Sequence, residues 1–357
     1  MKIFFQYLIR NCLLLIFLVC FPLALSAQEA AKGSCAEKLQ TAQNLFDRGQ
    51  VEQVAGLLHD CLKSGFTREE SLSAYKLIIQ TYLFEDELEK ADSAMLDFLR
   101  RNPEYQLSET DHSSFVHLFN NFQVKPLVQI SLHFGTSLPF TTFVVPRNVP
   151  GIPTKGEYSA PAFNLYGSIE AKFKLTDKIE LNGEAGYSQI TFTNTEVFSD
   201  VGTTNYKETQ SRIEVPLSAT YNITNFGKFT PYARLGAGPA VILSSVATVD
   251  FKSFDQNGTD HTGTDLDRKD SRLKMDIFAQ AGAGMKYKTR GGYLFAEVRG
   301  NFGIFNQSVR SALPDDTHST DVLRSYYYHA DDDFNLNALN FSIGYTQIFY
   351  KPSKKGE

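Results

Sequence analysis

The sequence predicts an α + β protein of two parts: a small module of α-helical hairpins and an eight-stranded antiparallel β-barrel. Three observations predict it. Apolar residues recur with a helical period over residues 34–122, and they alternate with polar residues over 127–350, as strands require. Short and long connections alternate between the strand-like segments. The chain divides into residues 1–27, 28–122, 123–350 and 351–357.

The first of these segments has the order of a secretory signal peptide. Lys2 and Arg10 precede the apolar run CLLLIFLVCFPLAL, and the small residues of SAQEA follow it. We expect cleavage after Ala27. A lipoprotein modified at Cys20 is the alternative, although Val19 before it is bulky for that signal.

Removal of the signal leaves a single pair of cysteines, Cys35 and Cys61. An exported chain reaches an oxidising compartment, where one pair favours one disulfide. Cys35 opens the first predicted helix and Cys61 lies near the end of the second, so an antiparallel hairpin brings them together. Two buried free thiols are the alternative.

Residues 28–122 form the predicted helical module, which we place in the periplasm. Two helical hairpins turn at Gly49 and at residues 85–86, and they superpose at an offset of 37 residues. A fifth helix is predicted over 108–122. The second hairpin resembles a tetratricopeptide repeat in the spacing of Tyr75, Ile78, Tyr82, Ala91 and Pro103. This resemblance implies a groove for a peptide or partner protein, and a plain spacer is the alternative.

Strands are predicted at 127–138, 161–175, 178–193, 209–223, 229–244, 272–288, 293–306 and 336–350. Each exceeds the roughly 9–11 residues that cross a bilayer when tilted. The connections 176–177, 224–228 and 289–292 are short, whereas 139–160, 194–208, 245–271 and 307–335 are long. This alternation is typical of outer-membrane barrels with tight periplasmic turns. An even strand number puts both chain ends in the periplasm.

Each predicted strand has an apolar row, which we expect to face lipid, and an opposite polar row, which we expect to face the barrel interior. The polar rows carry six acids and five bases that should pair across the interior: Glu170, Lys172, Glu180, Glu184, Arg212, Glu214, Arg234, Lys274, Asp276, Glu297 and Arg299. A soluble sandwich or lipocalin-like barrel would show the same alternation. The secretion signal, loop asymmetry, strand lengths and even strand count favour the membrane. In the third strand the apolar parity shifts after Tyr187, which predicts a bulge.

Two consecutive strands carry a family resemblance. RIEVPLSATYNI, followed by KFTPYARLGAGPAVIL, resembles the PorT-like outer-membrane β-barrel family, and DIFAQAGAGMKYK and LNFSIGYTQIFY fit its later strands. The barrel is similar in size to the OmpA and OmpX transmembrane domains. The resemblance implies an outer-membrane location and a link to protein secretion.

Three functions follow as hypotheses. The first is a non-enzymatic barrel that anchors the helical module, with outer-membrane lipid and a periplasmic protein as partners. The second is a narrow transport channel. The third is a lipid-modifying enzyme, for which His133 is the one tempting residue, because GxSxG, HExxH and phosphate-loop motifs are missing from the sequence.

Other ligand classes are not expected. The chain has 40 acidic and 35 basic residues and a net charge of −5, so a nucleic-acid partner is not predicted. We expect neither metal nor cofactor. The acidic long connections, including residues 331–333, are predicted to be solvated loops, and cation bridges to anionic lipid are the alternative.

Overall fold

A computed structural model describes residues 35–145, 154–160, 164–198, 201–263, 265–309 and 322–356. The chain forms two compact units. The helical unit runs to Lys125 and also includes the chain from Tyr350 onward, and the barrel unit is Pro126–Phe349. The predicted signal peptide lies outside the described residues. No described helix is both long and apolar enough to span a membrane.

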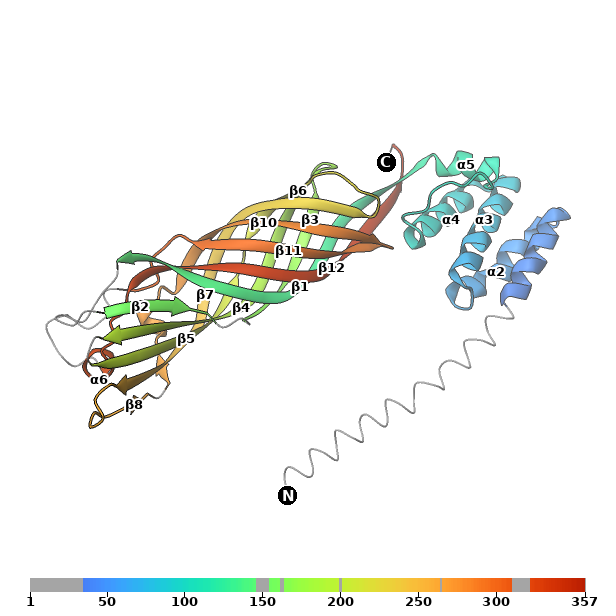
Figure 1. Ribbon diagram of the computed structural model, residues 1–357. Coiled ribbons are helices and arrows are strands. Elements are labelled where there is room, and N and C mark those ends of the chain that lie inside the picture. The colour runs from blue at the N-terminus through green and yellow to red at the C-terminus, as the bar shows by residue number, and fades with distance from the viewer. Residues whose placement is uncertain are drawn as a thin grey trace, which may run out of the picture. The chain divides into compact units, whose positions relative to one another are not determined.

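The helical unit consists of short antiparallel helices (Figure 1). The turns at Gly49 and Asp86 have positive φ values of +74° and +59°. The longest helix, α3, begins at a capping box, in which the Glu70 carboxylate accepts a hydrogen bond of 2.7 Å from the Thr67 backbone N–H. The elements are a helix over 35–47, η1 (Val51–Gln53), α2 (Val54–Lys63), α3 (Arg68–Phe84), α4 (Leu88–Arg101) and α5 (Ser113–Phe119).

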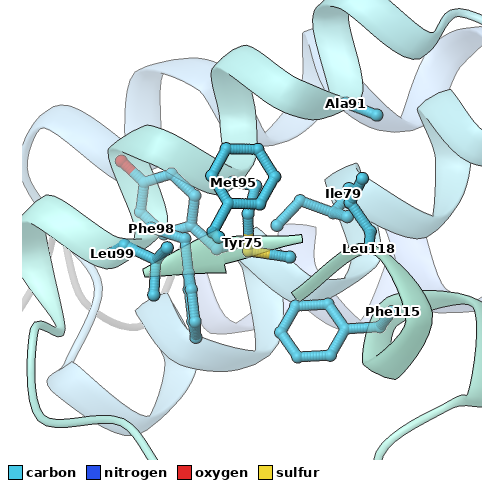
Figure 2. Close-up of a cluster of buried hydrophobic side chains, with 9 residues drawn as sticks. Tyr75, Ile79, Ala91, Met95, Phe98, Leu99, Phe115 and Leu118 are labelled. Carbon is cyan, nitrogen blue, oxygen red and sulfur yellow. The ribbon is translucent and has the colours of Figure 1, made fainter. Parts of the chain in front are cut away.

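Figure 2 shows the apolar core that holds α3, α4 and α5 together. Phe98 lies at its centre and contacts Phe115 edge-on, with ring centroids 5.5 Å apart. Tyr105, in the connection before α5, also contacts the Phe98 ring, with ring centroids 5.0 Å apart. Aromatic pairs in this geometry add to the stabilisation that burial alone provides.

The predicted disulfide between Cys35 and Cys61 is confirmed. It joins the start of the first helix to α2, and both cysteines are buried. The bond closes a loop with a sequence separation of 26 residues.

Replacing both cysteines with serine should destabilise the helical unit by about 3 kcal/mol, because the unfolded segment regains the entropy of an open loop. The helical circular dichroism of the full chain in detergent micelles, followed against urea, measures this loss. Reduced wild-type protein should unfold at the same urea concentration as the double variant. Equal urea midpoints for the oxidised wild type and the variant would show that the bond does not stabilise the unit.

The C-terminal segment, predicted as a polar tail over 351–357, packs within the helical unit. Lys354 forms an ion pair with Asp92 of α4. The Tyr350 hydroxyl donates a 2.7 Å hydrogen bond to Glu104. The Lys355 backbone N–H donates one of 2.8 Å to the carbonyl oxygen of Asn121. The last residues are therefore part of this unit's structure.

The barrel unit is built from antiparallel strands, several of which continue well beyond their predicted ends. The strands are β1 (Phe122–Val145), β2 (Thr154–Ser159), β3 (Leu165–Lys174), β4 (Ile179–Phe198), β5 (Gly202–Glu214), β6 (Leu217–Asn222), β7 (Phe229–Ser253), β8 (His261–Thr262), β9 (Leu266–Asp267), β10 (Met275–Thr289), β11 (Gly292–Gly303) and β12 (Asp333–Lys354). Two short helices, η2 (Lys269–Ser271) and α6 (Val322–Tyr327), lie in the connections.

The strands close into a barrel (Figure 1). The strand order around it is β1, β3, β4, then β5 or β6, then β7, β10, β11 and β12, and β12 pairs with β1. Both β5 and β6 lie between β4 and β7, so they share one position. The break between them falls at Val215 and Pro216, because proline has no N–H to donate to the ladder. The single strand predicted over 209–223 is thus two strands.

The outer and inner faces of the barrel differ in polarity. The outward residues near the short turns are apolar and exposed, such as Leu181, Leu217, Leu235, Leu294 and Ile343. The inward residues at the same level are polar and buried. Apolar residues outside and polar residues inside reverse the arrangement of a water-soluble core, as lipid around a barrel would require.

Beyond the apolar band, β4, β5 and β7 extend into what we call the distal sheet: residues 189–198, 202–211 and 245–253. Its outward face carries Lys207, Asp250 and Lys252, which would be costly in hydrocarbon. Its inner face carries an apolar core that packs against α6 and the segment that follows it. This inner core contains Ile190, Phe192, Tyr206, Ala247, Val249, Leu323, Phe334 and Leu336.

The distal sheet corrects three predictions. Residues 194–208 form mostly strand, so they are not the long loop that was predicted, and β7 continues to Ser253, so the long connection predicted over 245–271 begins later than expected. The bulge predicted after Tyr187 is also wrong, because β4 pairs with β5 without a register shift. Ile190 and Phe192 simply face an apolar interior.

Candidate functional site

A cluster of paired charges fills the barrel interior at the level of the apolar band. Arg234 of β7 forms ion pairs with Glu170 of β3 and, at 3.2 Å, with Glu297 of β11. Arg299 of β11 contacts Glu297 at 2.6 Å and Glu184 of β4 at 2.7 Å. All of these side chains are buried. We call Glu170, Lys172, Glu184, Arg234, Glu297 and Arg299 the central cluster; its three acids balance its three bases.

Other polar side chains complete the hydrogen bonds of this cluster. His133 of β1 contacts Glu170 at 2.9 Å, and the Tyr232 hydroxyl donates to Glu297 at 2.6 Å. Ser131, the hydroxyl nearest to His133 along β1, bonds to Thr346 instead, at 2.7 Å. The described contacts therefore join His133 to a carboxylate and do not join it to Ser131.

The other predicted interior residues lie in different surroundings. Glu180 pairs with Lys286 at 2.7 Å, a base that the sequence analysis did not include. Arg212 is buried and bonds to the amide oxygens of Gln210 and Gln307. Two acids receive hydrogen bonds from uncharged side chains: Glu214 from Ser188 at 2.7 Å and Asp276 from Gln307 at 2.8 Å.

Lys274 does not belong to the interior network. Its side chain is 70% exposed and pairs with Asp270, which is also exposed, at 3.3 Å. It lies one residue before β10 begins, so the strand parity does not extend to it.

A second buried charge cluster lies inside the distal sheet. Arg272 contacts Glu208 of β5 at 2.6 Å and Asp331 at 2.9 Å, and Arg268 also pairs with Asp331. His329 stacks on the ring of Tyr206, with centroids 4.2 Å apart. We call this the distal cluster: Glu196, Tyr206, Glu208, Arg268, Arg272, His329 and Asp331.

The distal cluster corrects the prediction that residues 331–333 are solvated. Asp331, Asp332 and Asp333 are all buried. The Tyr158 hydroxyl donates a 3.1 Å hydrogen bond to Asp332. This contact attaches the segment after α6 to β2, which pairs with β4 of the distal sheet. Residues 310–321 of the same predicted loop lie outside the described residues.

The helical unit contains a groove of about 380 Å³ between α2, α3 and α4. Tyr75 and Ile78 of α3 are buried and form its apolar bottom. Its rim is exposed and mostly basic, with Lys63 on α2 and Lys90 and Arg101 on α4. We call this the helical groove. It is a concavity that could receive part of another molecule.

The barrel sequence matches a family model. The model for the outer membrane protein beta-barrel domain covers residues 120–308, more than half of the chain. The chain belongs to this family. Its barrel unit is therefore an outer-membrane β-barrel, and lipid surrounds the apolar band. No curated protein matches the sequence of this outer-membrane protein.

Solved structures of outer-membrane proteins are similar to it at low identity. Neisserial surface protein A is 14% identical, with a TM-score of 0.29, over 64% of this chain and 97% of that one. OprG from Pseudomonas aeruginosa is 11% identical, with a TM-score of 0.29, over 63% and 97%. Ail of Yersinia pestis is 11% identical, with a TM-score of 0.27, over 62% and 99%.

Some buried charged residues of this outer-membrane protein were not predicted from the sequence, because their partners are distant along the chain. Arg272 and Glu208 lie 64 positions apart, and both fall in segments predicted to be loops or strand ends. Lys286 shares the parity of Asp276, which is a signal that could have identified it. His329 carries no local signal, since only the tertiary structure brings Glu196 to it.

The distal cluster should loosen as the pH rises toward 9. Burial would lower the pKa of His329, but the carboxylates of Asp331 and Glu196 outweigh burial and raise the pKa to about 9. This folded-state pKa exceeds the unfolded value of roughly 6.5. The imidazolium therefore stabilises the cluster fully below pH 6.5, by roughly 3 kcal/mol, and the stabilisation is lost as the pH rises through 9.

Hydrogen exchange around Leu323 and Phe334 measures this effect when wild type and His329→Gln are compared at each pH. The wild type should be better protected at pH 6, and the difference should disappear by pH 10. A difference that stays constant with pH would show that His329 does not titrate in this range.

Proposed function

We propose that this outer-membrane protein is a non-enzymatic anchor whose helical unit binds another protein in the periplasm. The helical groove carries the proposal, because it is a defined concavity with an apolar bottom and a charged rim. The barrel interior separately supports the role of an anchor. Balanced ion pairs fill the central cluster, which favours a closed, stable anchor over a solute path.

We further propose that the barrel crosses the membrane with eight strands, β5 and β6 together forming one of them. The sheet order and the shared position of β5 and β6 support this count. With an even number, the start of β1 and the end of β12 lie at the same rim as the short turns after β3, β6 and β10. The helical unit and both chain ends are then periplasmic, where the Cys35–Cys61 disulfide can form.

Two sequence resemblances, one in the helical unit and one in the barrel, indicate what process the protein serves. The helical unit resembles a tetratricopeptide pair in its hairpins and in the spacing around Tyr75 and Tyr82. The barrel resembles the PorT-like family, which implies a role in protein secretion or envelope organisation. A barrel that fixes a protein-binding unit at the inner surface of the outer membrane fits either role.

Photo-crosslinking in cells tests this function. A photoreactive amino acid at Ser93, in the helical groove, should crosslink a periplasmic protein, whereas the same group at Glu52, outside the groove, should not. Equal crosslinking at both positions, or none at Ser93, would count against a partner bound in the groove.

Conductance in planar bilayers tests the alternative of a narrow channel. The anchor should show no steady conductance, because the central cluster occupies the interior. Steady channels that are abolished by neutralising Arg234 would show that the interior charges serve transport instead.

A further inference from the structure

The helical groove differs in charge from the unit that contains it. Residues 35–125 and 350–357 of this unit carry sixteen acidic and twelve basic side chains, a net charge of −4. The groove lining reverses this ratio, with three bases and one acid. A local basic surface on an acidic unit is the kind of contrast that selects a charged partner.

The bases at the rim are held over aromatic rings. The Lys90 ammonium lies 5.7 Å from the centroid of Tyr82, and the Arg101 guanidinium lies 5.9 Å from that of Tyr75. Both rings belong to α3, so α3 positions the charges of α4. The aliphatic stems of such bases can cover apolar surface while the charged ends stay in water.

The charge at the rim is only partly neutralised within the unit. Asp97, the one acid in the lining, pairs with Arg100 outside it, at 2.8 Å. Lys90 pairs with Glu87 at 2.7 Å, and Lys63 is 3.8 Å from the exposed Asp60. Within the described part of the chain, Arg101 has no ion-pair partner. Arg101 is therefore available to a ligand carboxylate.

We propose that the helical groove binds an acidic segment of a periplasmic protein, with an apolar side chain over Tyr75 and Ile78 and flanking carboxylates at Lys63 and Arg101. This inference rests on the proposed function and adds the chemistry of the partner. A volume of about 380 Å³ is at the small end of ligand pockets, which run from roughly 300 to 1,000 Å³. It suits a few side chains of an extended peptide.

Charge favours a peptide over an anionic lipid surface. A bilayer would meet the whole unit, whose net charge of −4 repels it. A peptide meets only the groove, where the bases prevail. Its binding should also weaken with salt, since the rim is exposed and screening acts over roughly 8 Å at physiological ionic strength.

The test uses the full chain in detergent micelles and a fluorescent peptide of alternating glutamate and leucine, with binding read by anisotropy. The double variant Lys63→Glu/Arg101→Glu should bind the peptide at least ten-fold more weakly than wild type. Lys38→Glu/Arg48→Glu makes the same change in net charge on residues outside the groove lining, and should leave the affinity unchanged. Unchanged helical circular dichroism confirms that each variant folds.

Several outcomes would overturn the inference: equal affinity for both double variants, no preference over a lysine–leucine peptide, or displacement of the peptide by anionic phospholipid vesicles. Crosslinking at Ser93 separates this failure from failure of the proposed function. If the groove variant still crosslinks the same partner in cells, the partner is real but charge does not select it. If wild type captures nothing there, the proposed function fails.

Discussion

Replacing Arg234 with methionine is expected to lower the free energy of unfolding of the barrel by about 3–5 kcal/mol. The guanidinium is the shared partner of Glu170 and Glu297, and all three side chains are buried. Methionine fills much of the same volume but leaves both carboxylates short of positive charge. Removal of one partner from a buried ionic cluster costs far more than the net stabilisation that the intact cluster provides.

Unfolding in urea, followed by the heat-modifiable migration of the barrel on gels, measures the loss. Lys274→Met is the matched control, because it removes a base that is 70% exposed and should change stability by less than about 0.5 kcal/mol. Adding Glu297→Gln to Arg234→Met should restore part of the stability. If both single variants unfold at the same urea concentration, the central cluster does not stabilise the barrel as we argue.

Replacing Arg272 with methionine should release the segment after α6 from the distal sheet, with a loss of about 3–5 kcal/mol in the free energy of local opening. Arg272 neutralises Glu208 and Asp331 at once, and its guanidinium lies 5.5 Å from the ring of Phe334. Without Arg272, the buried carboxylates of Glu208 on β5 and Asp331 after α6 lose the guanidinium that lies between them. The membrane-embedded strands do not depend on this contact, so the effect should stay local.

Hydrogen exchange of residues 323–336 in the full chain measures this opening. Lys207→Met is the control, since Lys207 neighbours Glu208 on β5 but faces outward and is exposed. Exchange should accelerate in the Arg272 variant and remain unchanged in the control. Equal protection in both would show that the apolar core around Ile190 and Phe192 holds the segment without the ion pairs.

The membrane-embedded part of the barrel was predictable because lipid imposes a simple rule on the sequence. Every outward residue must be apolar, so rows such as that of Leu235 and Ala237 are visible as alternation. The disulfide was predictable for a similar reason, since removal of the predicted signal peptide would leave only Cys35 and Cys61 to pair. In both cases the environment constrains residues that lie close together along the chain.

The distal sheet could not be predicted by that rule, because water outside and an apolar core inside invert the pattern. The change of parity between Tyr187 and Ile190 marks the level at which this inversion occurs, and it resembled a bulge. The burial of Asp331 depends on Arg268 and Arg272 from another connection, and nothing in the local sequence of either segment indicates the partner. The prediction that Lys274 faces the interior was wrong for a different reason: the strand alternation was extended to a residue that lies before the strand begins.

The packing of the last residues against the helical unit has a consequence for biogenesis. The helices are synthesised first, yet the contacts of Asp92, Glu104 and Asn121 with residues 350–355 can form only after those residues have been synthesised. In topological terms, the barrel is an insertion within the helical unit. A chain truncated before Tyr350 could not make these contacts, so they form only in a chain whose barrel has been fully translated.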